Sequence, residues 1–316
     1  MSEPTTAAAA LRDVPAEPGV AKPDPILRVH GVRRNFGGLT AVDVDHLEVQ
    51  RGVITALIGP NGAGKTTLFN LLTGFDRPDG GAWSLDGRDL GHVASHRVAK
   101  RGMVRTFQLT KALSRLTVLD NMLLGAAQQR GERFLPALVP AAWRGQERAN
   151  TQRAEQLLER FQLLDKRDDY AGELSGGQRK LLEMARALMV EPRLVMLDEP
   201  MAGVNPALVQ SLLGHVTSLR DEGMSVIFVE HDMDVVMTIS DWVVVLAEGR
   251  VIAEGPPERV AEDPQVIAAY LGSEEPEPED DGQPTGGPAP TAADDEHDQP
   301  GGGPSPDDPA TGGGAR

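Results

Sequence analysis

The 316-residue chain contains no cysteine. This absence excludes a disulfide framework, a thiolate nucleophile and a cysteine-based metal site, and it is typical of proteins of a reducing cytoplasm. The sequence also lacks an apolar run near the ~20 residues that a membrane-spanning helix needs, and its N-terminus has no basic region followed by an apolar one. We therefore expect a soluble, cytoplasmic protein.

Negative charge is abundant but unevenly distributed. The formal net charge is -16 at pH 7, and twelve acidic residues but only one basic residue lie in 273–316. That tail is rich in proline and glycine and poor in large apolar residues, so it cannot bury enough surface to offset the entropy of ordering. We predict a disordered acidic tail over 273–316 and a disordered, proline- and alanine-rich extension over 1–25. No basic stripe indicates a nucleic-acid partner.

A folded domain is expected over 26–272, and its clearest motif follows an apolar run. The stretch VITALIG, residues 53–59, is typical of a buried parallel strand. GPNGAGKTT follows at once and leads into the helical spacing of LFNLLTG, which is the strand, glycine-rich loop and helix of a P-loop. Backbone N–H groups of such a loop surround phosphates, while Lys65 adds a charge and Thr66 a magnesium-binding hydroxyl. The predicted nucleotide-binding residues are Gly59, Pro60, Asn61, Gly62, Ala63, Gly64, Lys65, Thr66 and Thr67.

A second apolar strand, RLVMLDEP, ends in two carboxylates. Asp198 is a candidate Mg²⁺ ligand because hard cations prefer oxygen, and Glu199 could polarise a water for in-line attack on a γ-phosphate. An isolated Asp-Glu pair is usually a helix cap or a solvated pair, but the upstream P-loop favours nucleoside triphosphate hydrolysis here. Electrostatic positioning would then provide most of the catalysis.

The stretch LSGGQ, residues 174–178, resembles the signature motif of ATP-binding cassette (ABC) proteins. RTFQ with Gln108, MAGVNP after the glutamate and VEHDM with His231 match the pattern of that family in order, over about 26–272. The resemblance implies an α/β fold with a RecA-like P-loop core, an antiparallel β subdomain and a helical subdomain over about 109–190 that carries the signature. It also implies ATP and Mg²⁺ as ligands.

The same resemblance implies a site shared between two ATPase subunits, identical or different. They would close head to tail, so that each signature contacts the ATP bound by the opposite subunit. Gln108 and His231 would assist Glu199 in catalysis by sensing and orienting the attacking water. The residues expected to contact the opposite ATP are Ser175, Gly176, Gly177 and Gln178.

The remaining ligands of the site also come from the resemblance. Thr66, Gln108 and Asp198 are the implied Mg²⁺ ligands. Phe36 takes the place of the aromatic residue that stacks on adenine, and packing in the core is the alternative for this side chain.

The loop Ala-Gly-Val-Asn at 202–205 stands where many ABC ATPases have Ser-Ala-Leu-Asp, and Asn205 can hydrogen-bond but carries no charge. Together with VRTFQLTKALSRLTVLDNMLLGA and DPQVIAAYLG, it resembles the larger ATP-binding subunit of branched-chain amino acid importers. This implies a second ATPase subunit, two transmembrane permease subunits and, indirectly, a substrate-binding protein, at the cytoplasmic face of the cell membrane. Importers of urea or short-chain amides and lipopolysaccharide-export ATPases stay as alternatives, because these segments do not recognise the cargo.

Two other ABC classes fit the organisation less well. A translation ATPase would carry two cassettes, and a DNA-repair ATPase would separate its P-loop from its signature by a long coiled coil, whereas this chain has one of each motif in one segment. Residues 133–145, RFLPALVPAAWRG, are unusually apolar. They indicate either a surface for the coupling helix of a permease or a loop packed on its own subdomain.

Overall fold

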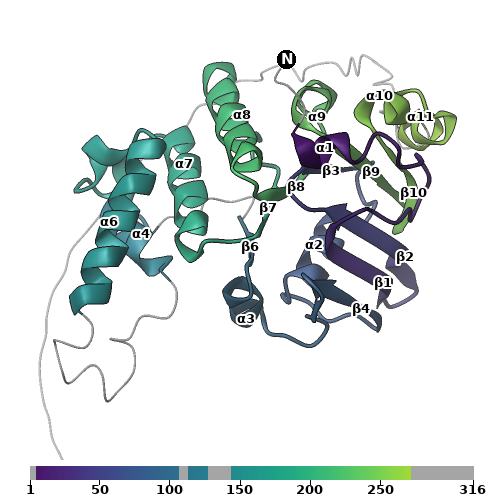
Figure 1. The fold of residues 1–316 in the computed structure, drawn as a ribbon, viewed down its shortest axis with the longest axis horizontal. Coiled ribbons are helices and arrows are strands. Elements are labelled where there is room, and N and C mark those ends of the chain that lie inside the picture. Colours follow the sequence, from purple (N-terminus) through teal and green to yellow (C-terminus); the bar gives the residue numbers. More distant parts are fainter. Residues whose placement is uncertain (1–4, 107–112, 127–143, 272–316) are drawn as a thin grey trace, which may run out of the picture. The chain divides into compact units, whose positions relative to one another are not determined.

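In the computed structural model, which describes residues 5–106, 113–126 and 144–271, the described part of the chain forms two β-sheets surrounded by helices (Figure 1). The smaller sheet is antiparallel, with the order β2-β1-β4-β5. Its strands are β1 (Pro25–Phe36), β2 (Leu39–Gln50), β4 (Gly80–Leu85) and β5 (Arg88–Asp89).

The larger sheet has six strands in the order β10-β9-β3-β8-β7-β6. Strands β6 to β9 and β3 pair in parallel, and β10 pairs antiparallel to β9. The central strands β3, β7 and β8 are buried along their whole length, which confirms the buried parallel strands predicted from the apolar runs. The strands are β3 (Ile54–Ile58), β6 (Met103–Arg105), β7 (Leu194–Asp198), β8 (Ser225–Val229), β9 (Trp242–Ala247) and β10 (Arg250–Gly255).

Three helices from the middle of the chain form a group of their own. Helices α4, α6 and α7 contact one another beside the β6 edge of the larger sheet, next to α8 (Figure 1). The described α-helices are α1 (Thr6–Ala9), α2 (Lys65–Leu72), α3 (Ser95–Lys100), α4 (Val118–Leu124), α6 (Arg144–Arg160), α7 (Gly176–Ala187), α8 (Pro206–Asp221), α9 (Met233–Ile239), α10 (Pro257–Ala261) and α11 (Pro264–Leu271). Short 3-10 helices cover Leu164–Lys166, Ala171–Glu173 and Leu188–Val190.

Strand β3 separates two hydrophobic cores because successive side chains of a strand point to opposite faces of the sheet. Ile54, Ala56 and Ile58 belong to the core formed with the helices around α7 and α8. Leu57 belongs to the core formed with α2 and the antiparallel sheet. The P-loop that follows β3 is therefore anchored on both sides.

The register of the parallel strands aligns their carboxyl ends. Asp198, the last residue of β7, pairs with Val229 at the end of β8, and Val229 also pairs with Leu57 of β3. The loops that leave these three strands therefore start at one edge of the sheet. Ligands of open parallel sheets bind at this edge.

The predicted disorder of the N-terminal extension is wrong for residues 5–24, which pack against the domain. Thr5 caps α1 by accepting a hydrogen bond from the backbone N–H of Ala8, at 3.2 Å. Leu11 is 3% exposed and joins the core on the side of the antiparallel sheet. The composition is that of a linker, but several apolar side chains of the segment pack on the same core as Leu11: Ala7, Ala8, Val14 and Val20.

A buried ion pair holds the end of this extension. Lys22 Nζ lies 2.7 Å from Glu254 Oε2 of β10, and the two side chains are 1% and 0% exposed. Trp242 Nε1 donates a hydrogen bond of 2.8 Å to the same oxygen, and the ammonium group lies 4.3 Å from the indole ring centroid. The ion pair, the hydrogen bond from Trp242 and the contact between the ammonium group and the indole ring together offset the free-energy cost of removing Lys22 and Glu254 from water.

All described residues belong to one compact unit that spans Met1–Glu275. Gln108, most of the apolar segment 133–145 and the acidic tail 273–316 lie outside the described residues. The predicted roles of these three parts stay predictions. Within the described residues, no helix is both long and apolar enough to cross a membrane.

Candidate functional site

The P-loop requires glycine at two positions. Gly59 and Gly64 have φ angles of 146° and 98°, which residues with side chains rarely adopt. A Cβ atom on Gly59 would collide with the carbonyl oxygen of Leu246, and one on Gly64 with that of Ala41. The loop is therefore held tightly against strand ends β9 and β2, and its backbone reaches the edge of the sheet without side chains in the way.

Lys65 starts helix α2 and turns back over the loop. Its ammonium group donates hydrogen bonds to the carbonyl oxygens of Gly59, at 2.5 Å, and Pro60, at 2.9 Å. Burial lowers the pKa of Lys65, while the nearby carboxylates of Glu199 and Asp198 act in the opposite direction. Lys65 therefore contacts the P-loop carbonyls and also lies close enough to Glu199 and Asp198 to interact with their charges.

Asp198 is 3% exposed and pairs with an arginine that the sequence reading did not assign. Arg105 Nη2 donates a hydrogen bond of 2.5 Å to Asp198 Oδ2, and Arg105 Nη1 donates one of 2.6 Å to Asn70 Oδ1 of α2. The guanidinium carbon lies 5.7 Å from the ring centroid of Phe69. Arg105 therefore joins β6, β7 and the P-loop helix, and it compensates the buried carboxylate.

Glu199 follows Asp198 in an unusual backbone conformation. Its φ angle is 46°, in the left-handed region that non-glycine residues seldom occupy. Its backbone N–H donates a hydrogen bond of 3.0 Å to the carbonyl oxygen of Val229. Such a conformation persists where the surrounding structure fixes it, and it clusters at functional sites.

His231 and Phe36 are both accessible in the single chain. The His231 side chain is 70% exposed, and its Nδ1 lies 3.9 Å from Glu230 Oε2. Phe36, at the end of β1, is 49% exposed and lies 4.6 Å from the guanidinium carbon of Arg34. This exposure argues against a core-packing role for Phe36, and its contact with adenine stays a prediction.

The signature lies at the start of α7, where it caps the helix. Ser175 Oγ accepts a hydrogen bond of 3.2 Å from the Gln178 N–H, and Gln178 Oε1 accepts one of 2.9 Å from the Ser175 N–H. This reciprocal capping box explains why serine and glutamine are spaced by three residues. A Cβ atom on Gly177 would collide with Leu208 of α8, whereas one on Gly176 would meet nothing within 4 Å. Packing therefore explains Gly177, whereas no contact among the described residues explains Gly176.

Asn205, which replaces the aspartate of many ABC ATPases, has a local role as well. Its side chain accepts a hydrogen bond of 2.9 Å from the Leu208 N–H and caps α8, whose first residue is Pro206.

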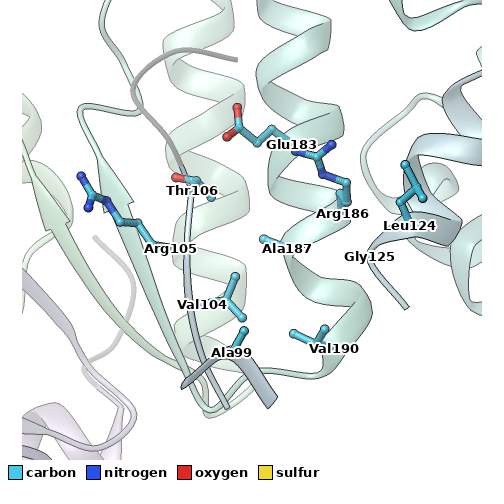
Figure 2. Close-up of a pocket in the computed structure, with 10 residues that line it drawn as sticks. All are labelled: Ala99, Val104, Arg105, Thr106, Leu124, Gly125, Glu183, Arg186, Ala187 and Val190. Atoms are coloured by element: carbon cyan, nitrogen blue, oxygen red, sulfur yellow. The ribbon is translucent and has the colours of Figure 1, made fainter. Parts of the chain in front are cut away.

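A cavity of about 260 Å³ lies between β6, α4 and α7, beside the nucleotide-binding edge. Figure 2 shows β6 residues on one side of α7 and Leu124 and Gly125 of the α4 segment on the other, with Arg105 pointing away from the other lining side chains. The lining residues are Ala99, Val104, Arg105, Thr106, Leu124, Gly125, Glu183, Arg186, Ala187 and Val190.

Fold and site together define a P-loop nucleotide-binding protein of the ABC type. Residues 42–202 match the ABC transporter family, and residues 250–276 match the family described as branched-chain amino acid ATP-binding cassette transporter. The chain therefore belongs to the ABC transporter family, and its C-terminal match places it with the branched-chain amino acid ATP-binding cassette transporters.

Named relatives support this placement. The chain is 42% identical over 250 residues to the high-affinity branched-chain amino acid transport ATP-binding protein BraF of Pseudomonas aeruginosa, covering 78% of this chain and 98% of the relative. It is 41% identical over 251 residues to the corresponding LivG protein of Escherichia coli, with 78% and 98% covered.

Two solved structures have the same fold. A nucleotide-free ATP-binding cassette from an ABC transporter is 37% identical, with a TM-score of 0.68 over 78% of this chain and 98% of that one. The ADP conformation of the cassette MJ1267 is 36% identical, also with a TM-score of 0.68, over 78% and 99%. These likenesses confirm the predicted fold of P-loop core, antiparallel subdomain and helical subdomain.

Proposed function

We propose that the chain hydrolyses ATP to drive import of branched-chain amino acids. The observation that supports the proposal is that Lys65 of the P-loop lies close to Asp198 and Glu199 at one edge of the parallel sheet, where the chain also leaves β8 toward His231. Phosphates would bind to the backbone N–H groups of the P-loop and at the start of α2, where the helix dipole favours negative charge. Lys65 would exchange two neutral carbonyl partners for charged phosphate oxygens, which are stronger acceptors.

The residues fit a magnesium ion that arrives with the nucleotide. A single buried carboxylate and one hydroxyl suit Mg²⁺, which keeps several waters and uses phosphate oxygens as ligands. Asp198 and Thr66 would hold the ion, together with Gln108, and the ion would neutralise charge on the phosphates. Glu199 would accept a proton from the attacking water, and His231 would help to orient that water.

Hydrolysis would take place between two ATPase subunits arranged head to tail, alike or different. Ser175 and Gly176 are exposed at the N-terminus of α7, so they are free to approach a γ-phosphate that another subunit holds. This arrangement gives the unhindered surface of Gly176 a reason that the single chain does not supply.

The subunits would work at the cytoplasmic face of the membrane, attached through two permease subunits that receive cargo from a substrate-binding protein. We place the permease helix at the cavity between β6, α4 and α7, because the walls of this cavity are mostly apolar. It borders both the strand that carries Arg105 and the helix that carries the signature. Movement of a docked helix would therefore displace β6 and α7, which both carry residues of the nucleotide site.

Glu199→Gln tests the catalytic assignment. ATP binding should persist while hydrolysis falls by about 10²–10⁴, because the substitution removes a base but little volume. Binding of a fluorescent ATP analogue and phosphate release should be measured on the subunit assembled with its transporter partners. Lys65→Ala is the matched variant and should weaken binding itself; near-normal turnover in Glu199→Gln would overturn the assignment.

Transport assays in vesicles test the cargo. Leucine uptake that requires ATP and Lys65 supports the proposal, and uptake of urea or acetamide without leucine would move the chain to the amide importers. If the vesicles take up neither leucine, urea nor acetamide while ATP hydrolysis is intact, import of these solutes is contradicted.

A further inference from the structure

Two charged side chains hold the loop that follows Glu199. Lys180 Nζ donates hydrogen bonds to the carbonyl oxygens of Pro200, at 2.9 Å, and Ala202, at 2.5 Å. Between them, the backbone N–H of Met201 donates a hydrogen bond of 2.9 Å to Glu230 Oε1. Three consecutive residues are thus bound through their main chain, one by a carboxylate and two by an ammonium group.

The two side chains come from the elements that carry the other functional motifs. Lys180 lies on α7, two residues after the signature residue Gln178. Glu230 directly precedes His231, and its side chain is 1% exposed. The loop is therefore connected to the signature helix on one side and to the segment of the predicted water-orienting histidine on the other.

The loop needs such support because of the conformation at its start. Glu199 has a φ of 46°, and a residue with a side chain remains in this region only where its surroundings fix it. Its own N–H is bound to Val229, which fixes the residue on the strand side. On the other side, the hydrogen bonds to Lys180 and Glu230 fix the main chain that follows.

Burial explains why these contacts are strong. Burial lowers the pKa of Lys180, which is partly buried, and raises the pKa of Glu230, whose side chain is 1% exposed. A hydrogen bond to a charged group is about twice as strong as one between neutral groups, and it gains further strength in a medium of low dielectric constant.

We propose that Lys180 and Glu230 are positioning residues for Glu199: they fix the loop Pro200–Ala202 and thereby hold the catalytic carboxylate in place for hydrolysis. The proposal rests on the catalytic role of Glu199 proposed above. Because Lys180 belongs to the signature helix, a displacement of that helix on dimer closure would be transmitted to Glu199 of the same chain. Both residues would act through the loop and not by contact with the nucleotide.

Two matched pairs of variants test the proposal. Lys180→Met removes the donors and Lys180→Arg keeps them, whereas Glu230→Met removes the acceptor and Glu230→Gln keeps it. Lys166→Met is the control, since Lys166 lies at the surface, where it pairs with Asp169 at 3.1 Å. The full-length subunit should be assembled with its transporter partners and assayed for kcat, KM, affinity for a fluorescent ATP analogue and thermal unfolding.

Both methionine variants should lower kcat by about tenfold or more, since misplacing a catalytic group by about 1 Å can reduce the rate about 10²-fold. ATP affinity should stay within about twofold of the parent, because the P-loop is unaltered. Lys180→Arg and Glu230→Gln should recover most of the lost kcat, and the double methionine variant should lose less than the product of the single losses because both act on one loop.

Unchanged kcat in the methionine variants would overturn the proposal. So would failure of both methionine variants to fold, or equal losses in the conservative and methionine variants, because each result would assign the contacts to stability alone. If the parent assembly does not hydrolyse ATP at all, the proposed function itself is wrong. The kcat of the parent therefore separates a failure of the proposed function from a failure of the positioning proposal.

Discussion

The P-loop and the signature helix carry the same kind of feature, glycines at the N-terminus of a helix, but this chain surrounds the two very differently. A side chain at Gly59 or Gly64 would strike a neighbouring backbone carbonyl, and Lys65 lies over the loop. At the signature, a side chain on Gly176 would meet open space, and Ser175 is exposed. One half of the site is thus enclosed within the chain, whereas the other half is an exposed surface that, in the proposed dimer, would contact the second subunit.

The largest expected effect lies in the enclosed half. Arg105→Met should destabilise the nucleotide-free protein by about 3–5 kcal/mol, because it leaves the buried carboxylate of Asp198 without a partner. Denaturant unfolding measures this loss. Arg193→Met is the control: Arg193 pairs with Asp86 but is 51% exposed, so its loss should stay below about 1 kcal/mol. Equal losses in the two variants would contradict the importance of the buried pair.

Two glycine substitutions sharpen the contrast directly. Gly64→Ala should weaken binding of a fluorescent ATP analogue by more than about tenfold, or about 1.4 kcal/mol, because the added methyl group meets the Ala41 carbonyl. Gly176→Ala should leave this binding and the thermal unfolding temperature close to the parent values. Its effect should appear only in ATP-driven dimer formation. A binding defect in Gly176→Ala as large as that in Gly64→Ala would remove the distinction between the two halves.

A smaller effect is expected from the helix cap of the signature. Ser175→Ala should lower the free energy of unfolding by about 1 kcal/mol, because the N–H of Gln178 loses its acceptor. Equilibrium unfolding of the variant and the parent measures the change. A loss several times larger would mean that the signature is coupled to the core more tightly than its exposure indicates.

The smallest effect concerns pH. Burial and the charge of Arg160 lower the pKa of His215, which stacks on Phe161. The neutral ring therefore contributes stability fully above the unfolded-state pKa of about 6.5, and this contribution is lost as the pH falls through the lowered folded-state pKa. Between pH 7 and pH 5 the thermal unfolding temperature of the parent should fall more than that of His215→Phe, which keeps the ring contact. Parallel curves would contradict the shift.

The sequence was sufficient for those parts of the fold that local patterns specify. The runs ITALI, LVMLD and SVIFV are apolar throughout because their strands are covered on both faces, and the P-loop glycines stand where positive φ angles are required. The capping box of the signature is also a local pattern, but the sequence analysis did not assign it to Ser175 and Gln178.

Contacts between distant segments could not be read in the same way. Lys22 and Glu254 are 232 positions apart, and Arg105 and Asp198 are 93 positions apart, so no local pattern joins either pair. Glu230 lies inside the motif VEHDM and Lys180 lies two residues after the signature, yet their partners are backbone atoms of a third segment. Their roles follow from the tertiary structure.

The central claim, that the signature of this chain serves the nucleotide of the other subunit, is tested most directly by Ser175→Arg in the assembled transporter. A bulky cation would then stand where a small hydroxyl should approach a phosphate. ATP photo-crosslinking, assigned to each subunit by mass, should show normal labelling at this chain's Lys65 side and loss of closure around the partner's nucleotide, with transport reduced. Loss of labelling confined to this chain's own P-loop would contradict the claim.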